Sequence, residues 1–192
     1  MFDTDREWIW YHEPQHEWKD SELTIMTQGE TDFWQGTHYG FRRDNGHCLL
    51  THVHGDFSLV ARVTCKANAK YDQAGIMVRL DAENWLKASI EAENKTTSRL
   101  GSVMTNHGYS DWATVDIDAS IHTMWYRVQS KGADLLVEYS ESGKRWQQMR
   151  IAHIHLYHGS LAVGVYGCSP TEGEGCTILF DHVQVGPSQW SD

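Results

Sequence analysis

Short runs in which apolar and polar residues alternate follow one another along most of the chain. In residues 57–67, for example, every second residue from Phe57 to Cys65 is apolar. An alternation with a period of two predicts β-strands, and no segment has the spacing of an amphipathic helix over three turns. The same alternation marks residues 21–28, 73–80, 85–92, 98–106, 124–149, 160–169 and 176–186.

Turn residues divide these runs and predict how the strands connect. Residues 131–134 and 141–144 each interrupt the run 124–149 with a glycine-containing turn, and Asn45-Gly46 is a further hairpin signal. Residues 147–158 fit either a strand or a helical turn, and residues 170–175 read as a simple connection. We expect about ten to fourteen short strands in two packed antiparallel sheets. The chain has no linker and no internal repeat, so residues 1–192 are expected to form a single domain.

Residues 73–80 and 85–92 form strands with two unlike faces. One face is apolar and belongs in the core. On the other, Arg79, Trp85, Lys87 and Glu91 point the same way. Cross-strand neighbours lie about 5 Å apart, so these side chains are expected to form one outward patch. By the same parity, residues 125–129 extend the patch through Arg127.

Two further segments, residues 31–41 and 105–113, combine loop-like residues with aromatic and acidic ones. Together with the patch they predict a groove lined by Trp and Tyr, with charged and amide side chains between them. Carbohydrate sites have this composition, because sugar C–H faces stack on aromatic rings and planar polar groups bind hydroxyls. The alternative is a surface lattice of ion pairs, which contributes little to stability. The outward position of Trp85 favours a binding site.

The composition excludes several partners. The net charge of −10 argues against nucleic acid and anionic membranes, which need basic patches. No apolar run is long enough to span a membrane, and the acidic N-terminus does not resemble a signal peptide, so a cytoplasmic location is expected. The four scattered cysteines are then expected to be free thiols.

Catalytic and metal-binding chemistry have weaker signals. A glycoside hydrolase needs two carboxyl groups about 5–10 Å apart, and the acid pair Asp116 and Asp118 lacks the further acid of a glucanase motif. The pairs His52/His54 and His153/His155 would each place two imidazoles on one strand face. A metal site would need a third ligand from elsewhere, so no metal or other cofactor is predicted.

Four ordered blocks of the sequence resemble one known family. They are residues 31–47, 71–79, 84–91 and 110–113. Together these blocks are similar to the concanavalin A-like domain family known as regulation-of-enolase-like, whose function is unknown. The resemblance implies a jelly-roll sandwich of two curved antiparallel sheets with a site on the concave sheet. The family's motif positions would be Asp32, Trp34, Tyr71, Asp72, Gln73, Arg79, Trp85, Lys87, Glu91, Asp111 and Trp112.

Three functions are consistent with these observations. The first is non-catalytic binding of a carbohydrate or sugar phosphate, the phosphate being motivated by Arg79, Lys87 and Arg127. The second is regulation of, or interaction with, a metabolic enzyme, as the family's name implies. The third is glycoside hydrolysis. For the first, Trp85→Ala and Arg79→Ala are expected to abolish binding without unfolding the protein.

Overall fold

Every regular element in the computed structural model, which describes residues 2–3 and 5–191, is a β-strand. The described residues form sixteen strands, two more than the upper end of the expected range. Three of them, β1 (Ile9–Tyr11), β4 (Phe33–Gln35) and β5 (Arg42–Asp44), have only three residues, too few for a visible alternation. The expected all-β sandwich is confirmed.

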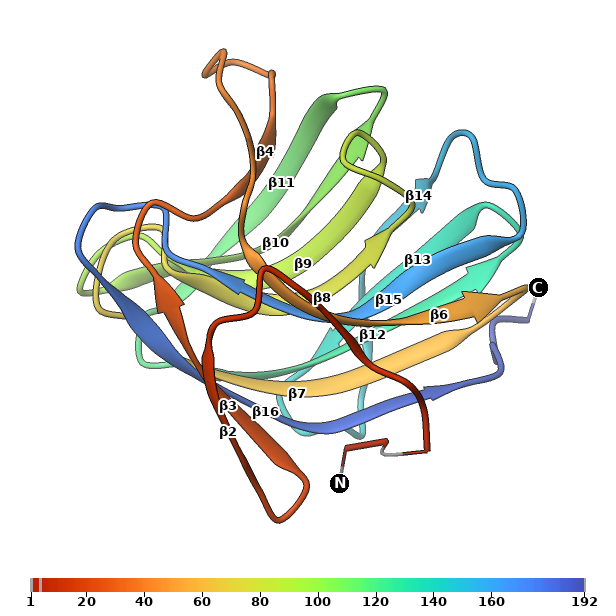
Figure 1. The fold of residues 1–192 in the computed structure, drawn as a ribbon, viewed down its shortest axis with the longest axis horizontal. Coiled ribbons are helices and arrows are strands. Elements are labelled where there is room, and N and C mark those ends of the chain that lie inside the picture. Colours follow the sequence, from red (N-terminus) through yellow and green to blue (C-terminus); the bar gives the residue numbers. More distant parts are fainter. Residues whose placement is uncertain (1, 4, 192) are drawn as a thin grey trace.

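Two seven-stranded antiparallel sheets make up most of the molecule (Figure 1). In order across the first sheet, the strands are β1, β6 (His47–His54), β15 (Ser160–Cys168), β8 (Gln73–Arg79), β9 (Trp85–Ala92), β10 (Thr97–Asn106) and β11 (Tyr109–Asp118). In order across the second, they are β14 (Gln147–His153), β13 (Asp134–Ser140), β12 (Thr123–Lys131), β7 (Ser58–Lys66), β16 (Glu174–Gly186), β3 (Glu22–Gln28) and β2 (Gln15–Lys19).

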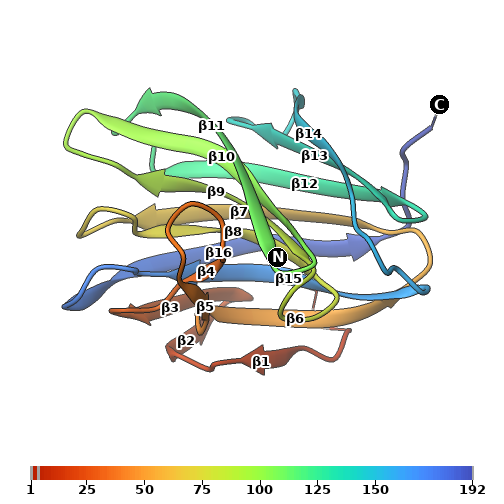
Figure 2. The same cartoon turned by 90° about the horizontal axis from the view of Figure 1, so that it is seen from above.

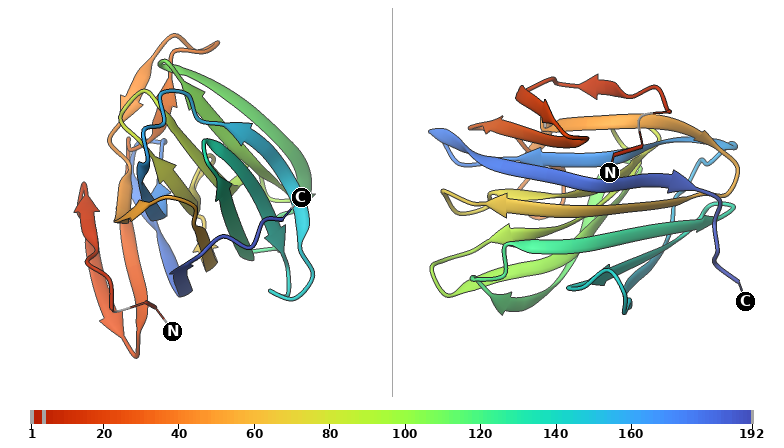
Figure 3. Two further views of the ribbon diagram at one scale, coloured as in Figure 1. Left: turned by 90° about the vertical axis from the view of Figure 1, so that its right-hand side faces the viewer. Right: turned by 90° about the horizontal axis from the view of Figure 1, so that it is seen from below.

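The sheets lie on each other as twisted layers. Strands β1 and β2 form one edge of the pair and β11 and β14 the other, as the views in Figures 2 and 3 show. Side chains on the facing sides of the two sheets pack into one core, which includes Ile76, Leu86, Tyr126 and Phe180. The expected pairing of 73–80 with 85–92 and the turns at 131–134 and 141–144 are confirmed.

A third, two-stranded sheet of β4 and β5 covers part of the first sheet. The segment that contains it stands on the face turned away from the second sheet (Figure 1). Below it lies a second apolar cluster that includes Phe33, Met77, Trp85 and Tyr166. Strand β8 is therefore buried along its whole length, on both faces. We call residues 30–46 the covering segment.

The prediction of a hairpin turn at Asn45-Gly46 is wrong. These residues connect β5 to β6, which belong to different sheets, whereas the β4–β5 hairpin turns at residues 36–41. Asn45 instead ties the segment together, because its Oδ1 accepts from the Asp32 amide at 3.0 Å. A Cβ atom at Gly46 would lie 2.3 Å from the Phe33 ring, so close packing explains this glycine.

One ambiguous segment and one segment expected to be loop-like contain strands. Residues 147–153 form β14, and residues 105–113, expected to be loop-like, form a tight β10–β11 hairpin. His107 and Gly108 occupy its turn, both with positive φ. Within residues 105–113, only His107 and Gly108 form a turn. The residues on either side of them pair with one another as strands β10 and β11.

Candidate functional site

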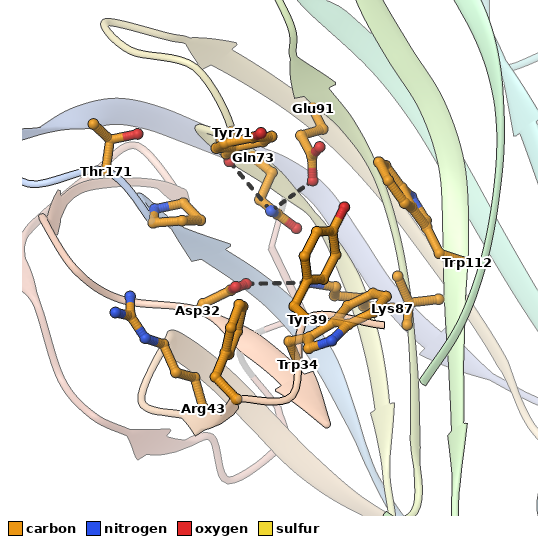
Figure 4. Close-up of a pocket in the computed structure, with 13 residues that line it drawn as sticks. Asp32, Trp34, Tyr39, Arg43, Tyr71, Gln73, Lys87, Glu91, Trp112 and Thr171 are labelled. Carbon is orange, nitrogen blue, oxygen red and sulfur yellow. Dashed lines mark hydrogen bonds and ion pairs between the residues drawn. The ribbon is translucent and has the colours of Figure 1, made fainter. Parts of the chain in front are cut away.

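A pocket of about 320 Å³ lies between the covering segment and the outer face of the first sheet. Strands β8 to β11 supply one side, the covering segment supplies another, and the β15–β16 loop closes the rim (Figure 4). The lining residues are Asp32, Trp34, Tyr39, Phe41, Arg43, Tyr71, Gln73, Lys87, Glu91, Val103, Trp112, Pro170 and Thr171.

Strand register sets the floor of the pocket. Gln73 lies directly opposite Glu91, while Lys87, Val103 and Trp112 lie opposite one another across β9, β10 and β11. Because alternate residues of a strand share a face, these side chains all project away from the main core. The pair of Gln73 and Glu91 makes one part of the floor polar. Val103 and Trp112, beside Lys87, make the other part largely apolar.

Lys87 joins the floor to the covering segment. Its Nζ donates to the carbonyl oxygen of Phe33 at 2.8 Å and lies 3.5 Å from Asp32 Oδ1. The Lys87 side chain is only 4% exposed, and its Nζ also lies near the rings of Trp85 and Tyr166. A buried cation needs such partners, so Lys87 is held in place before any ligand arrives.

Glu91 is positioned by a glutamine. Gln73 Nε2 donates to Glu91 Oε2 at 2.9 Å and to the Tyr71 carbonyl at 3.2 Å, while Gln73 Oε1 accepts from the Tyr166 hydroxyl. Burial raises the pKa of Glu91 to about 7; Lys87 opposes this shift, and the negative charge of Asp32 adds to it. Glu91 therefore exchanges a proton near neutral pH.

Aromatic rings form the walls. Trp34 and Trp112 meet edge to face with centroids 6.4 Å apart, and Trp34 also meets Tyr39 in this way at 5.4 Å. Trp34 Nε1 donates to the Thr37 carbonyl, which fixes the ring. Tyr39, Phe41 and Tyr71 are 53%, 41% and 39% exposed, so the rim is aromatic and accessible.

The raised pKa of Glu91 predicts a pH-dependent stability. Between pH 4.5 and about 7 the folded protein binds more protons at Glu91 than the unfolded chain does, so the free energy of unfolding falls as pH rises. Glu91→Gln keeps an acceptor for Gln73 but cannot titrate. Relative to this variant, the wild type should lose about 3 kcal/mol between pH 4.5 and pH 8 in denaturant titrations.

Glu93→Gln is the matched control for this prediction. Lys70 holds the pKa of Glu93 below its usual range, so the stability that this carboxylate contributes is lost as pH falls. The two variants should therefore change the pH slope in opposite directions. Parallel stability curves for the wild type and Glu91→Gln would contradict the assignment.

Seven of the twelve residues singled out by sequence lie at this pocket: Asp32, Trp34, Tyr71, Gln73, Lys87, Glu91 and Trp112. Sequence reasoning missed Tyr39, Phe41, Arg43, Val103, Pro170 and Thr171. The aromatic content of residues 31–41 was a signal for Tyr39 and Phe41. Pro170 and Thr171 belong to the loop expected to be a simple connection, and only the fold brings that loop to the rim.

Arg79 and Trp85 are not on an open surface, contrary to expectation. Their parity is as predicted, but the covering segment buries them, and Trp85 is 0% exposed. Arg79 pairs with Asp44, with Nη1 at 2.8 Å from Oδ1 and Nη2 at 2.7 Å from Oδ2. Both side chains hold the covering segment on the sheet instead of lining the pocket.

Three further residues lie elsewhere. Asp72 is buried at the end of the sandwich, where its Oδ2 accepts from the backbone amides of Asn68 and Ala69. Asp111 forms an ion pair with Arg150 of β14. The expectation that Arg127 extends the patch is wrong, because β12 belongs to the second sheet, where Arg127 pairs with Glu138.

The histidine pairs are also placed. His52 and His54 lie on β6, whereas His153 Nδ1 contacts Asp134 Oδ1 at 2.7 Å and its ring lies 5.1 Å from that of His155. Across residues 2–3 and 5–191, no three His, Cys, Asp or Glu side chains are grouped to hold a metal ion.

All four cysteines are buried free thiols. The described residues include no helix with the length and hydrophobicity of a membrane span.

Solved structures share this architecture. The carbohydrate binding module CBM66 from Bacillus subtilis has a TM-score of 0.59 at 13% identity, covering 96% of this chain and 99% of that one. The GH43 protein BlXynB from Bacillus licheniformis has a TM-score of 0.65 at 16% identity, covering 85% of this chain but 32% of that one. At these identities the likeness shows the jelly-roll sandwich fold alone.

Two yeast matches are much closer in sequence. Regulation of enolase protein 1 of Saccharomyces cerevisiae is 36% identical over 183 residues, covering 95% of this chain and 87% of that protein. A crystal structure of a functionally unknown protein from the same yeast has a TM-score of 0.88 at 33% identity, covering 95% of this chain and 97% of that one. Residues 10–188 match the model of a family described as protein of unknown function (DUF1349). The chain belongs to the DUF1349 family.

Proposed function

We propose that the pocket binds a saccharide without transforming it. The observation that carries this proposal is the joining of aromatic walls and a carboxyl-and-amide floor in a single pocket. Rings such as Trp34 and Trp112 offer apolar faces to sugar C–H groups, and the carboxyl groups of Glu91 and Asp32 offer planar polar groups to hydroxyls. The volume of about 320 Å³ is at the small end of ligand sites, which fits one sugar ring.

The charges of the site favour a saccharide over a sugar phosphate. The three cations that motivated a phosphate ligand are each paired within the protein: Arg79 with Asp44, Lys87 with Asp32 and Arg127 with Glu138. Two of them also lie outside the pocket lining. A phosphate would therefore meet the carboxyl groups of Asp32 and Glu91 with few unengaged donors to offset their repulsion.

The comparisons with other proteins are compatible with this proposal. A carbohydrate binding module uses the same fold, although its ligand is a property of that protein. Fold alone does not carry function, so the proposal rests on the residues of the pocket.

Trp112→Ala is expected to weaken saccharide binding about tenfold or more, a loss of about 1.4 kcal/mol or more, because it removes one aromatic wall. A glycan array on the wild type identifies a ligand, and calorimetry then compares the variants. Trp146→Ala is the control: Trp146 is likewise half-buried and likewise lies under an arginine, but it directly precedes β14 of the second sheet.

Equal losses in Trp112→Ala and Trp146→Ala, or no binding to any glycan by folded wild type, would contradict the proposal. If the wild type released nitrophenol from nitrophenyl glycosides and Glu91→Gln did not, the function would be glycoside hydrolysis instead of binding alone. This outcome is worth measuring because Asp32 and Glu91 line one pocket.

Regulation of a metabolic enzyme is the second candidate. It is favoured by 36% identity to a protein named for regulation of enolase and by the exposed aromatic rim of Tyr39, Phe41 and Tyr71. Exposed aromatic residues are frequent energetic centres of protein interfaces. Assays of purified enolase with and without the protein discriminate the two candidate functions. If the wild-type protein neither binds enolase nor changes its activity, regulation of this enzyme is excluded.

A further inference from the structure

We propose that the saccharide bound in this pocket carries a protonated amino group, which lies between the carboxyl groups of Asp32 and Glu91. The inference rests on the proposed saccharide-binding function and names the class of ligand. It follows from which hydrogen-bonding atoms of the floor are already engaged and which are left for a ligand.

The floor offers acceptor atoms. Asp32 uses Oδ1 for the Phe33 amide and for Lys87, and Glu91 uses Oε2 for Gln73. Among the contacts of the described residues, none engages Asp32 Oδ2 or Glu91 Oε1. Both residues line the pocket, and in Figure 4 their carboxyl groups lie on either side of the Gln73 side chain.

The donors of the floor are largely consumed. Gln73 Nε2 uses both of its hydrogens, for Glu91 and for the Tyr71 carbonyl. Lys87 Nζ donates to the Phe33 carbonyl and pairs with Asp32. Arg43, the other cation of the lining, stacks on Phe41 at the rim and donates to the Glu30 carbonyl. A ligand matched to this floor must itself bring donors.

An ammonium group fits this arrangement better than a hydroxyl group. It has three donors and no acceptor, and its positive charge is also attracted to the carboxylates, which a hydroxyl group is not. The rings of Trp34, Tyr39 and Trp112 line the pocket, and aromatic faces attract cations, as the Arg99 guanidinium 5.4 Å from the Trp112 ring centroid illustrates. A cation would also relieve the repulsion between Asp32 and Glu91, which contributes to the raised pKa of Glu91.

The experiment compares sugars that differ at one position. Methyl glycosides of glucosamine and of galactosamine are titrated by calorimetry at pH 6.5, each beside its N-acetyl and 2-hydroxyl counterparts. We expect at least one amine to bind about tenfold tighter than both of its counterparts. Its binding should release a proton from Glu91, seen as a heat that changes with the ionisation enthalpy of the buffer.

Charge-removing variants locate the effect. Glu91→Gln and Asp32→Asn should each reduce the preference for the amine over its hydroxyl counterpart about tenfold. Asp118→Asn, which changes a carboxylate outside the pocket lining, should leave the preference unchanged. Circular dichroism confirms that each variant is folded.

The outcomes separate the two proposals. If a hydroxyl sugar binds and its amine counterpart binds no tighter, the amino-group inference is overturned and saccharide binding stands. If neither these glycosides nor any array glycan binds the folded wild type, both proposals fail. If cyclohexylamine binds as tightly as the amino sugar, the pocket recognises an amine alone and saccharide binding is overturned.

Discussion

Trp85→Ala should lower the free energy of unfolding by about 3–5 kcal/mol, the cost of truncating a fully buried Trp. Trp85 is 0% exposed and packs edge to face on Phe33, with ring centroids 6.2 Å apart. Its Nε1 donates to the Ala82 carbonyl at 3.2 Å. The truncation would leave a cavity directly under the covering segment. Because a domain is stable by only about 5–15 kcal/mol, this loss is a large share of the total.

This expectation reverses the one drawn from sequence, in which Trp85→Ala abolished binding without unfolding the protein. Denaturant titrations should show a larger loss of stability in Trp85→Ala than in Trp112→Ala, because Trp112 is only half-buried. Trp85→Phe, which keeps an aromatic ring in the cluster, should cost less than Trp85→Ala. A Trp85→Ala variant with wild-type stability and no saccharide binding would show that Trp85 acts in the pocket after all.

Arg79→Met should lower the free energy of unfolding by about 3 kcal/mol, because it leaves the Asp44 carboxylate without its partner. Arg79 is 9% exposed at its side chain and Asp44 is 20% exposed, which places the loss at the lower end for a broken buried pair. The pair joins β8 to β5 and thereby holds the covering segment. Tyr11 of β1 completes the group, since its hydroxyl donates to Asp44 Oδ2 at 2.7 Å.

A double-mutant cycle separates the ion pair from simple packing. Arg79→Met with Asp44→Asn should cost less than the sum of the two single substitutions, by at least about 1 kcal/mol, because the second change removes the unpaired charge. The pKa of Tyr11 is a further readout: burial and the bond to Asp44 raise it to about 12, and Asp44→Asn should lower it. Additive single and double losses in denaturant titrations would contradict the pairing.

The effect of both variants on ligand binding should be indirect. Neither Trp85 nor Arg79 lines the pocket, but both hold the segment that carries Asp32, Trp34 and Tyr39. If Trp85→Ala and Arg79→Met still bind the saccharide at low temperature, where each is folded, their effect on binding at higher temperature comes from lost stability.

Much of the fold could be predicted because its signals are local. Alternation identified most long strands, and turn residues located the hairpins at 131–134 and 141–144. Asn45-Gly46 misled because these residues serve contacts within the covering segment, Asn45 with the Asp32 amide and Gly46 with the Phe33 ring. Strands of three residues, such as β4, are too short to show a period.

The sequence by itself determined which side chains share a face. Gln73, Lys87 and Glu91 project from one side of β8 and β9 because side chains alternate along a strand, and the pocket uses that side. The family resemblance added residues from distant segments, of which Asp32, Trp34, Tyr71 and Trp112 reach the same pocket.

Only the tertiary structure decided what covers that face. Alternation defines the two sides of a strand but not what packs against each side. It therefore could not show that Trp85 and Arg79, on the side away from the main core, are buried. Nor could it assign β12 to a sheet, and Arg127 therefore lies on the opposite side of the molecule. Burial and sheet membership depend on contacts between distant segments, and here the covering segment turns half of an apparent surface into a second core.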